Sequence, residues 1–146
     1  MKYVVTEHEE SGVRIDVQPY LGQLPTLMSQ LPPGARSFLA EPGHFSFGDR
    51  CLHDMVVVPV LSDNLLSFGW TNGADDVLTI TYQDLSRIEI TNQDPDGTGG
   101  DTHPWEVIFD EILPAKTGCT HEIVCFEGTV FIEFADLHAT WLSQGE

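Results

Sequence analysis

The sequence predicts an α+β protein that is mainly β, built as an antiparallel sheet or open barrel with short N-terminal helices. Two observations carry this prediction. Short apolar runs, several of them alternating with polar residues, follow one another from residue 45 onward, and helical spacing of apolar residues is confined to residues 20–43. The 146 residues suit a single domain, 1–146, that can bury a core without metals or disulfides.

Strands are expected first at the N-terminus, followed by helical turns. The stretch "YVVTEHEESGVRIDVQ" holds two β-branched runs on either side of a Ser-Gly pair, which indicates a hairpin. Apolar residues at helical spacing predict helical turns over about 24–31 and 34–40, and the Pro32-Pro33 pair would end the first of them.

The rest of the chain is expected to form consecutive strands joined by short turns. The run "VLTITY" places Leu78, Ile80 and Tyr82 on one face of a strand and threonines on the other. The run "MVVVPVL" is apolar on both faces, as in a central strand, although Pro59 favours a bulge or an edge near its end. Six further runs bring the sheet to about seven to nine strands: "HFSFGD", "LLSFGW", "RIEIT", "WEVIFDEI", "HEIVCF" and "TVFIEF".

The register of the last hairpin follows if Glu127-Gly128 is a two-residue turn, since Glu122 then lies directly opposite Glu133. Like charges in that position destabilise a sheet, so either the register differs, a cation lies between them, or both carboxylates are solvated. The face assigned to the core holds His121, Ile123, Cys125, Val130, Ile132 and Phe134, and the opposite face holds Val124, Phe126 and Phe131.

Charge is the strongest compositional signal, because the formal net charge is −17. Residues 88–146 hold 12 acidic residues and 1 basic residue, against 11 and 5 in residues 1–87. Such a field repels nucleic acid and anionic membranes and attracts basic proteins and cations. The alternative is that the acidity serves only solubility or reflects a salt-adapted host.

The remaining compositional signals concern the compartment. The three cysteines are odd in number and lack metal-like spacing, which favours reduced thiols, and Cys51 and Cys125 sit among apolar residues as small core side chains would. The N-terminus has no secretory pattern, and no apolar run approaches the roughly 20 residues that span a bilayer. A cytoplasmic location is therefore expected.

Segment 92–106 resembles the first half of a calcium-binding loop. Asn92, Asp94 and Asp96 alternate and a glycine follows, as in an EF-hand, and Asp101 could complete a ligand set. The twelfth position is histidine rather than glutamate, and the flanking residues suggest strands rather than helices. An acidic turn-rich loop without metal is the alternative interpretation.

No motif in the chain predicts catalysis. The His53-Asp54 pair invites a metal or acid–base interpretation, but adjacent residues on a strand point to opposite faces. The serines lack a GxSxG context, the cysteines lack a basic activator, and no glycine-rich phosphate loop is present. We therefore expect neither enzymatic activity nor a cofactor.

One pattern over residues 45–137, about two-thirds of the chain, is similar to a known style of sequence. An aromatic pair leads into "LHDM", then come a hairpin and "VLTITYQDLSRIEI", and later "WEVIFDEI", "HEIVCF" and "GTVFIEFADL". This pattern resembles small β-rich bacterial proteins, some of which are grouped with immunity proteins of polymorphic toxin systems. The resemblance implies a non-enzymatic role in binding another protein, and it transfers no functional residues.

These observations predict an acidic protein-binding module whose partner is a basic protein, with an immunity protein that neutralises a basic toxin domain as its specific form. The alternative is a ligand- or calcium-binding β-protein that uses the loop 92–106. The partner surface is expected on acidic loops and strand faces of the C-terminal half: Asp94, Asp96, Asp101, Asp110, Glu122, Glu133 and Asp136. The metal ligands of the alternative would be Asn92, Asp94, Asp96 and Asp101.

Overall fold

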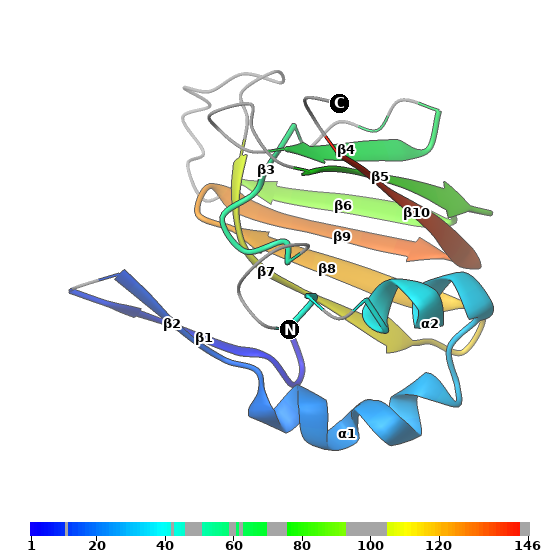
Figure 1. Ribbon diagram of the computed structural model, residues 1–146, viewed down its shortest axis with the longest axis horizontal. Coiled ribbons are helices and arrows are strands. Elements are labelled where there is room, and N and C mark those ends of the chain that lie inside the picture. The colour runs from blue at the N-terminus through cyan, green and yellow to red at the C-terminus, as the bar shows by residue number, and fades with distance from the viewer. Residues whose placement is uncertain are drawn as a thin grey trace.

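Figure 1 shows the computed structural model of the protein, which describes residues 1–10, 12–41, 43–45, 51–58, 61, 63–69, 76–92 and 105–143. Within these residues the chain forms mainly strands. The elements are β1 (Val5–Glu9), β2 (Gly12–Asp16), α1 (Gln18–Met28), α2 (Pro33–Leu39), β3 (Val56–Val57), β4 (Leu65–Gly69), β5 (Asp76–Gln83), β6 (Arg87–Asn92), β7 (Trp105–Pro114), β8 (Cys119–Cys125), β9 (Gly128–Phe134) and β10 (Asp136–Ser143).

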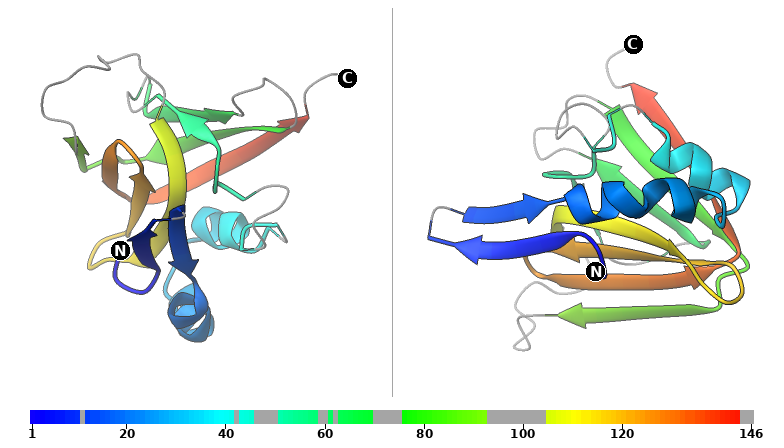
Figure 2. Two further views of the ribbon diagram at one scale, coloured as in Figure 1. Left: turned by 90° about the vertical axis from the view of Figure 1, so that its left-hand side faces the viewer. Right: turned by 90° about the horizontal axis from the view of Figure 1, so that it is seen from below.

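The strands form two antiparallel sheets, so the predicted α+β, mainly β class is confirmed in its broad form. The larger sheet has eight strands in the order β10-β5-β4-β3-β7-β8-β9-β6 and does not close into a barrel. The smaller sheet is the predicted N-terminal hairpin, β1-β2, which projects away from the larger sheet (Figures 1 and 2). Because the large sheet stays open, β6 and β10 are its edge strands.

Two corners of the chain join the halves of the large sheet. The chain passes from β5 into β6 and from β9 into β10, although neither pair of strands is hydrogen-bonded along its length. At these corners the Ala135 amide donates to the Gln83 carbonyl over 2.8 Å, and the Ser86 amide donates to the Glu133 carbonyl over 2.9 Å. A register shift between Val107 and Phe109 interrupts the pairing of β7 with β8, as a β-bulge does where a sheet bends.

The main core fills the concave side of this sheet, and α2 covers it with Ala35, Phe38 and Leu39. A second, smaller core lies on the opposite face of β7, where Tyr20 and Leu27 of α1 pack near Phe109. β7 is therefore buried on both faces, and six consecutive residues, Val107 to Ile112, are buried with no period of two.

The helices begin and end at different places from those predicted. α2 agrees closely with the predicted turns over 34–40. α1 starts six residues earlier than the predicted 24–31 and carries Pro25 inside it. Pro19 in the first turn explains the early start, since proline fits a first helical turn without losing a hydrogen bond.

The predicted register of the last hairpin is wrong by two residues, but its faces are right. Glu122 pairs with Phe131 and Ile123 pairs with Val130, so the loop between β8 and β9 is longer than two residues. A shift of two keeps every side chain on its predicted face, and the residues assigned to the core are all buried. Gly128 also lies close to β6, because a Cβ on it would be only 2.1 Å from the Thr91 carbonyl oxygen.

Three other strand predictions differ from the structure. β10 was not predicted, because Ala135 alone separates it from β9 and gives no turn signal. Of the expected central strand, the described residues form only the two-residue β3, which does lie between β4 and β7. Pro59, where a bulge or edge is expected, lies outside the described residues. Phe45 of the expected "HFSFGD" strand lies in a turn, and residues 46–50 are outside the described part of the chain.

Candidate functional site

The structure does not gather the predicted partner-binding acids into one open patch. Asp94, Asp96 and Asp101 lie outside the described residues, and so does most of the predicted metal loop. Asn92, the remaining metal candidate, ends β6, where it pairs with Gly128. The other four acids, Asp110, Glu122, Glu133 and Asp136, each have a partner within the chain.

Asp110 lies in the interior rather than on the partner-binding surface, which corrects the prediction. Its side chain is 1% exposed and lies between two buried histidines. The Nε2–H of His121 donates to Oδ2 over 2.7 Å, and Nε2 of His44 lies 3.4 Å from Oδ1. The Tyr82 hydroxyl and Nδ1 of His121 are 2.9 Å apart, so the buried network runs from Tyr82 through His121 and Asp110 to His44.

The electrostatics of this network favour an ionised carboxylate. Burial alone would raise the pKa of Asp110, but its interactions with His44 and His121 lower it well below its usual range. Burial, followed by the charge of Asp110, raises the pKa of Tyr82 well above its usual value, so its hydroxyl stays protonated. Each member is at most 1% exposed, so the whole network lies in the interior of the fold.

His44 is the least satisfied member of the network. Among the residues that the structure describes, neither of its ring nitrogens has a hydrogen-bond partner, and Oδ1 of Asp110 also lacks one. Its ring is instead enclosed by aromatic rings, with centroids 4.8 Å from that of Phe38 and 4.6 Å from that of Phe45. The contact between His44 and Asp110, at 3.4 Å, is therefore a close approach of two polar groups without hydrogen-bond geometry.

A pair of like charges does exist in the sheet, but in another place from the one predicted. Glu111 of β7 pairs in register with Glu122 of β8. The N-terminal segment resolves the repulsion, because the backbone amides of Lys2, Tyr3 and Val4 each donate to Glu111 over 2.7 Å. The Met1 ammonium lies 2.8 Å from Oε2 of Glu122. Glu122 is therefore engaged within the chain.

Asp136, another of the predicted partner-binding acids, holds a helix in place. Its two carboxylate oxygens accept from the amides of Gly34 and Ala35, at 3.1 and 3.0 Å. These amides belong to the first turn of α2, where backbone N–H groups have no partner within the helix. The N-cap residue, Pro32, has no side chain that could accept their hydrogen bonds. A carboxylate at a helix N-terminus also interacts favourably with the helix dipole. Asp136 thus ties α2 to the start of β10.

Glu133 lies on a solvent-facing part of the sheet. Nη1 of Arg87 is 3.3 Å from Glu133, and Nη2 of Arg87 is 2.6 Å from Glu89. The Arg87 guanidinium also lies 5.7 Å from the centroid of the Phe131 ring, within the range of a cation–π contact. The guanidinium of Arg87 therefore contacts two carboxylates and an aromatic ring on the same side of the sheet.

We call the surface formed by Glu89, Val124, Phe126, Phe131 and Glu133 the outer face. It belongs to β6, β9 and β8 and to the turn that joins β8 and β9, on the side away from the main core. Phe126 is 43% exposed, and Val124 and Phe131 are half-buried. The side chain of Glu89 is 55% exposed and that of Glu133 is 36% exposed. The outer face thus combines partly uncovered apolar groups with accessible carboxylates.

The other predicted pair, His53 and Asp54, lies in a turn rather than at the start of a strand. Asp54 has a φ of 71°, and this bend brings its carboxylate to 3.4 Å from Nε2 of His53. Nδ1 of His53 also lies 2.6 Å from the Ile108 carbonyl. The expectation that the two side chains point apart is therefore wrong. Among the described residues, no group of three or more His, Cys, Asp or Glu is arranged to hold a metal ion.

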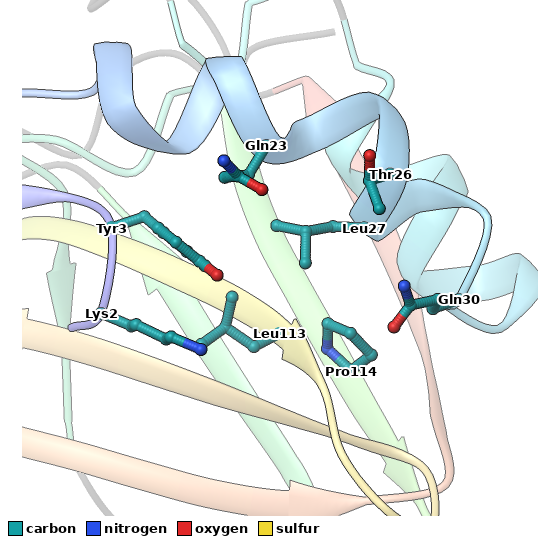
Figure 3. Close-up of a pocket in the computed structure, with 8 residues that line it drawn as sticks. All are labelled: Lys2, Tyr3, Gln23, Thr26, Leu27, Gln30, Leu113 and Pro114. Carbon is teal, nitrogen blue, oxygen red and sulfur yellow. The ribbon is translucent and has the colours of Figure 1, made fainter.

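A pocket of about 290 Å³ lies between α1 and the end of β7 (Figure 3). None of the predicted site residues lines it. Its lining residues are Lys2, Tyr3, Gln23, Thr26, Leu27, Gln30, Leu113 and Pro114. Lys2, Gln23, Thr26 and Gln30 are exposed, so the structure shows a solvated groove and no buried polar group aimed into it.

Sequence reasoning missed the buried network and the role of Glu111. A signal was present, because apolar residues flank Asp110-Glu111 on both sides, as they do in a strand buried on both faces. A charged residue inside such a strand needs a partner within the protein. The identity of those partners depended on the fold, since they come from β8, the segment after α2 and the N-terminus.

No protein-family model, curated protein or solved structure matches this chain. In the described part of the chain, no helix has the length and apolar character needed to cross a membrane.

Proposed function

We propose that this chain is a non-enzymatic protein-binding module that docks a basic protein on its outer face. The observation that supports this proposal most directly is the mixture of groups there. Phe126 and Phe131 offer aromatic contact area, and Glu89 and Glu133 offer accessible carboxylates beside them. Interfaces are typically centred on aromatic residues and bordered by polar ones.

Charge favours a basic partner. The net charge of −17 attracts a cationic protein at long range and raises its association rate, an effect that salt suppresses. Arg87 lies beside both glutamates and over Phe131, which indicates that a guanidinium fits this environment. An arginine of the partner would meet the same groups from outside.

The proposed contact differs from the one expected from sequence. Asp110, Glu122 and Asp136 serve internal roles, so the centre of the contact moves to β6 and β9. The resemblance to immunity proteins makes a basic toxin domain the first partner to test, in a cytoplasmic setting. Neutralisation would then occur by occupation of the toxin's surface, without chemistry by this chain.

The test compares three versions of the tagged protein in lysate of the source organism at low salt. The first is the wild type, and the second carries Phe126→Ser and Glu89→Lys on the outer face. The third carries Leu142→Ser on β10, the opposite edge of the sheet, where Leu142 is 57% exposed. Captured proteins are eluted with a salt gradient and quantified by mass spectrometry.

A basic protein retained by the wild type and by the Leu142→Ser variant, but lost with the outer-face variant, is the expected result. Capture alone does not show which surface binds the protein, so the comparison between the variants locates the binding surface. Equal capture by all three proteins, or no specific protein in any, would contradict the proposal. Circular dichroism of each variant verifies that the fold is retained.

A further inference from the structure

The strand β6 is an edge of the large sheet with a regular backbone. Among the described strands it pairs with β9 alone, and its register is continuous from Arg87 opposite Glu133 to Asn92 opposite Gly128. Its six residues extend over roughly 20 Å at about 3.3 Å per residue. The side of β6 away from β9 therefore presents backbone amides and carbonyls that no described strand uses.

The side chains of β6 add exposed apolar area to this edge. Ile88 and Ile90 pair in register with Ile132 and Val130 and so share the face that carries the main core. Their partners are fully buried, yet Ile88 is 37% exposed and Ile90 is 46% exposed. The core thus continues to the edge of the sheet and is left partly uncovered there.

β6 also lacks three features by which proteins commonly protect an edge strand. Edges are commonly blunted by proline, by a bulge or by lysines that point outward. None of these occurs between Arg87 and Asn92, and the one cation, Arg87, is held by Glu89 and Glu133. The other exposed side chains of this strand are the apolar Ile88 and Ile90, the acidic Glu89 and the neutral Thr91.

We propose that β6 binds an extended basic segment of the partner as an additional strand. This inference rests on the proposed function and specifies how the partner is recognised. Backbone hydrogen bonds to the free side of β6 supply affinity, as in other proteins that add a peptide strand to a sheet edge. Alternate side chains of the segment then point to opposite faces of the enlarged sheet.

This alternation fixes the chemistry of the segment. Side chains on the core-facing side meet Ile88 and Ile90 and should be apolar. Side chains on the opposite side meet Glu89, whose carboxylate is accessible, and should be cationic. The segment should therefore alternate between aliphatic residues and lysine or arginine.

The test uses a synthetic probe, an acetylated and amidated hexapeptide of alternating lysine and valine, with the ¹⁵N-labelled full chain. Two control peptides have the same length: one is fully N-methylated and cannot donate backbone hydrogen bonds, and the other has glutamate in place of lysine. Amide exchange is followed by NMR for every assigned residue. Only a paired strand slows exchange of the β6 amides that point away from β9.

Slowed exchange of those amides with the lysine–valine peptide, and with neither control, is the expected result. Shifts confined to Val124, Phe126 and Phe131, without slowed exchange in β6, would overturn strand addition and leave the proposed function standing. Equal binding of the glutamate peptide, or no binding of the lysine–valine peptide, would also overturn the inference.

Two matched variants locate the binding site independently. Ile90→Lys places a cation on β6, and Leu142→Lys makes the same kind of change on β10, the other edge strand. Loss of one apolar contact should weaken peptide binding about tenfold in the Ile90→Lys variant. Leu142→Lys should leave binding unchanged, and an equal loss in both variants would contradict the assignment to β6.

Discussion

Asp110 and Glu111 show how much two adjacent residues can differ in role. They lie on opposite faces of β7, and the fold satisfies Asp110 with histidines and Glu111 with backbone amides. The sequence predicts that they point in opposite directions, but it gives no sign of these partners. Long-range contacts decide their roles, and such contacts cannot be derived from strand periodicity.

Asp110→Asn should destabilise the protein by about 3 kcal/mol at pH 7, because the variant removes the charge that His44 and His121 face. Folding lowers the pKa of Asp110, so the ionised carboxylate stabilises the folded state at pH values above its ordinary pKa of about 4. This stabilisation is lost as the pH falls below that value toward the pKa of the folded state. Urea unfolding between pH 7 and pH 3 measures this difference. An Asp110→Asn variant as stable as the wild type at pH 7 would contradict the role of the network. The control is Asp84→Asn, the same substitution at an exposed residue.

The buried thiols should be unreactive in the folded protein. Burial raises the pKa of Cys119 and of Cys125 to about 12, with smaller effects from Asp136 and Glu127 respectively. Since the thiolate is the reactive form, iodoacetamide at pH 8 should label these two residues only after unfolding. Mass spectrometry of native and urea-treated samples measures the labelling. Rapid labelling of either thiol in the native protein would contradict its burial.

At the scale of the elements, side-chain faces were more predictable than boundaries or register. The faces of β5, β8 and β9 follow from alternation and are confirmed by burial. The loop between β8 and β9 was misjudged because Gly128 looked like a turn residue, whereas it permits close approach of β6. β10 was missed because a strand that continues through a corner has no turn signal before it.

Two helical glycines give a matched test of how α2 packs on β10. A Cβ at Gly34 would lie 1.8 Å from the Leu137 carbonyl oxygen, so Gly34→Ala must displace the helix. We expect a loss of about 1–3 kcal/mol in the free energy of unfolding. A Cβ at Gly22 in α1 meets nothing within 4 Å, so Gly22→Ala should stabilise by about 0.5–1 kcal/mol. Urea unfolding measures both, and equal effects would contradict the packing of α2.

For the whole molecule, the excess of acidic residues should make stability depend on salt. With a net charge of −17, self-repulsion opposes the compact state, and salt screens it. The melting temperature should therefore rise between low salt and about 0.5 M sodium chloride, although surface ion pairs such as Arg87–Glu89 weaken. A melting temperature that falls with salt would mean that these ion pairs outweigh the repulsion.

The central claim is that a basic protein binds the outer face. Hydrogen–deuterium exchange of the full chain, with and without the captured partner, tests it most directly. The account predicts slower exchange in β6, β9 and the turn that carries Phe126, with β10 and α2 unchanged. Slower exchange confined to β10 and α2, or no change in β6 and β9, would contradict it.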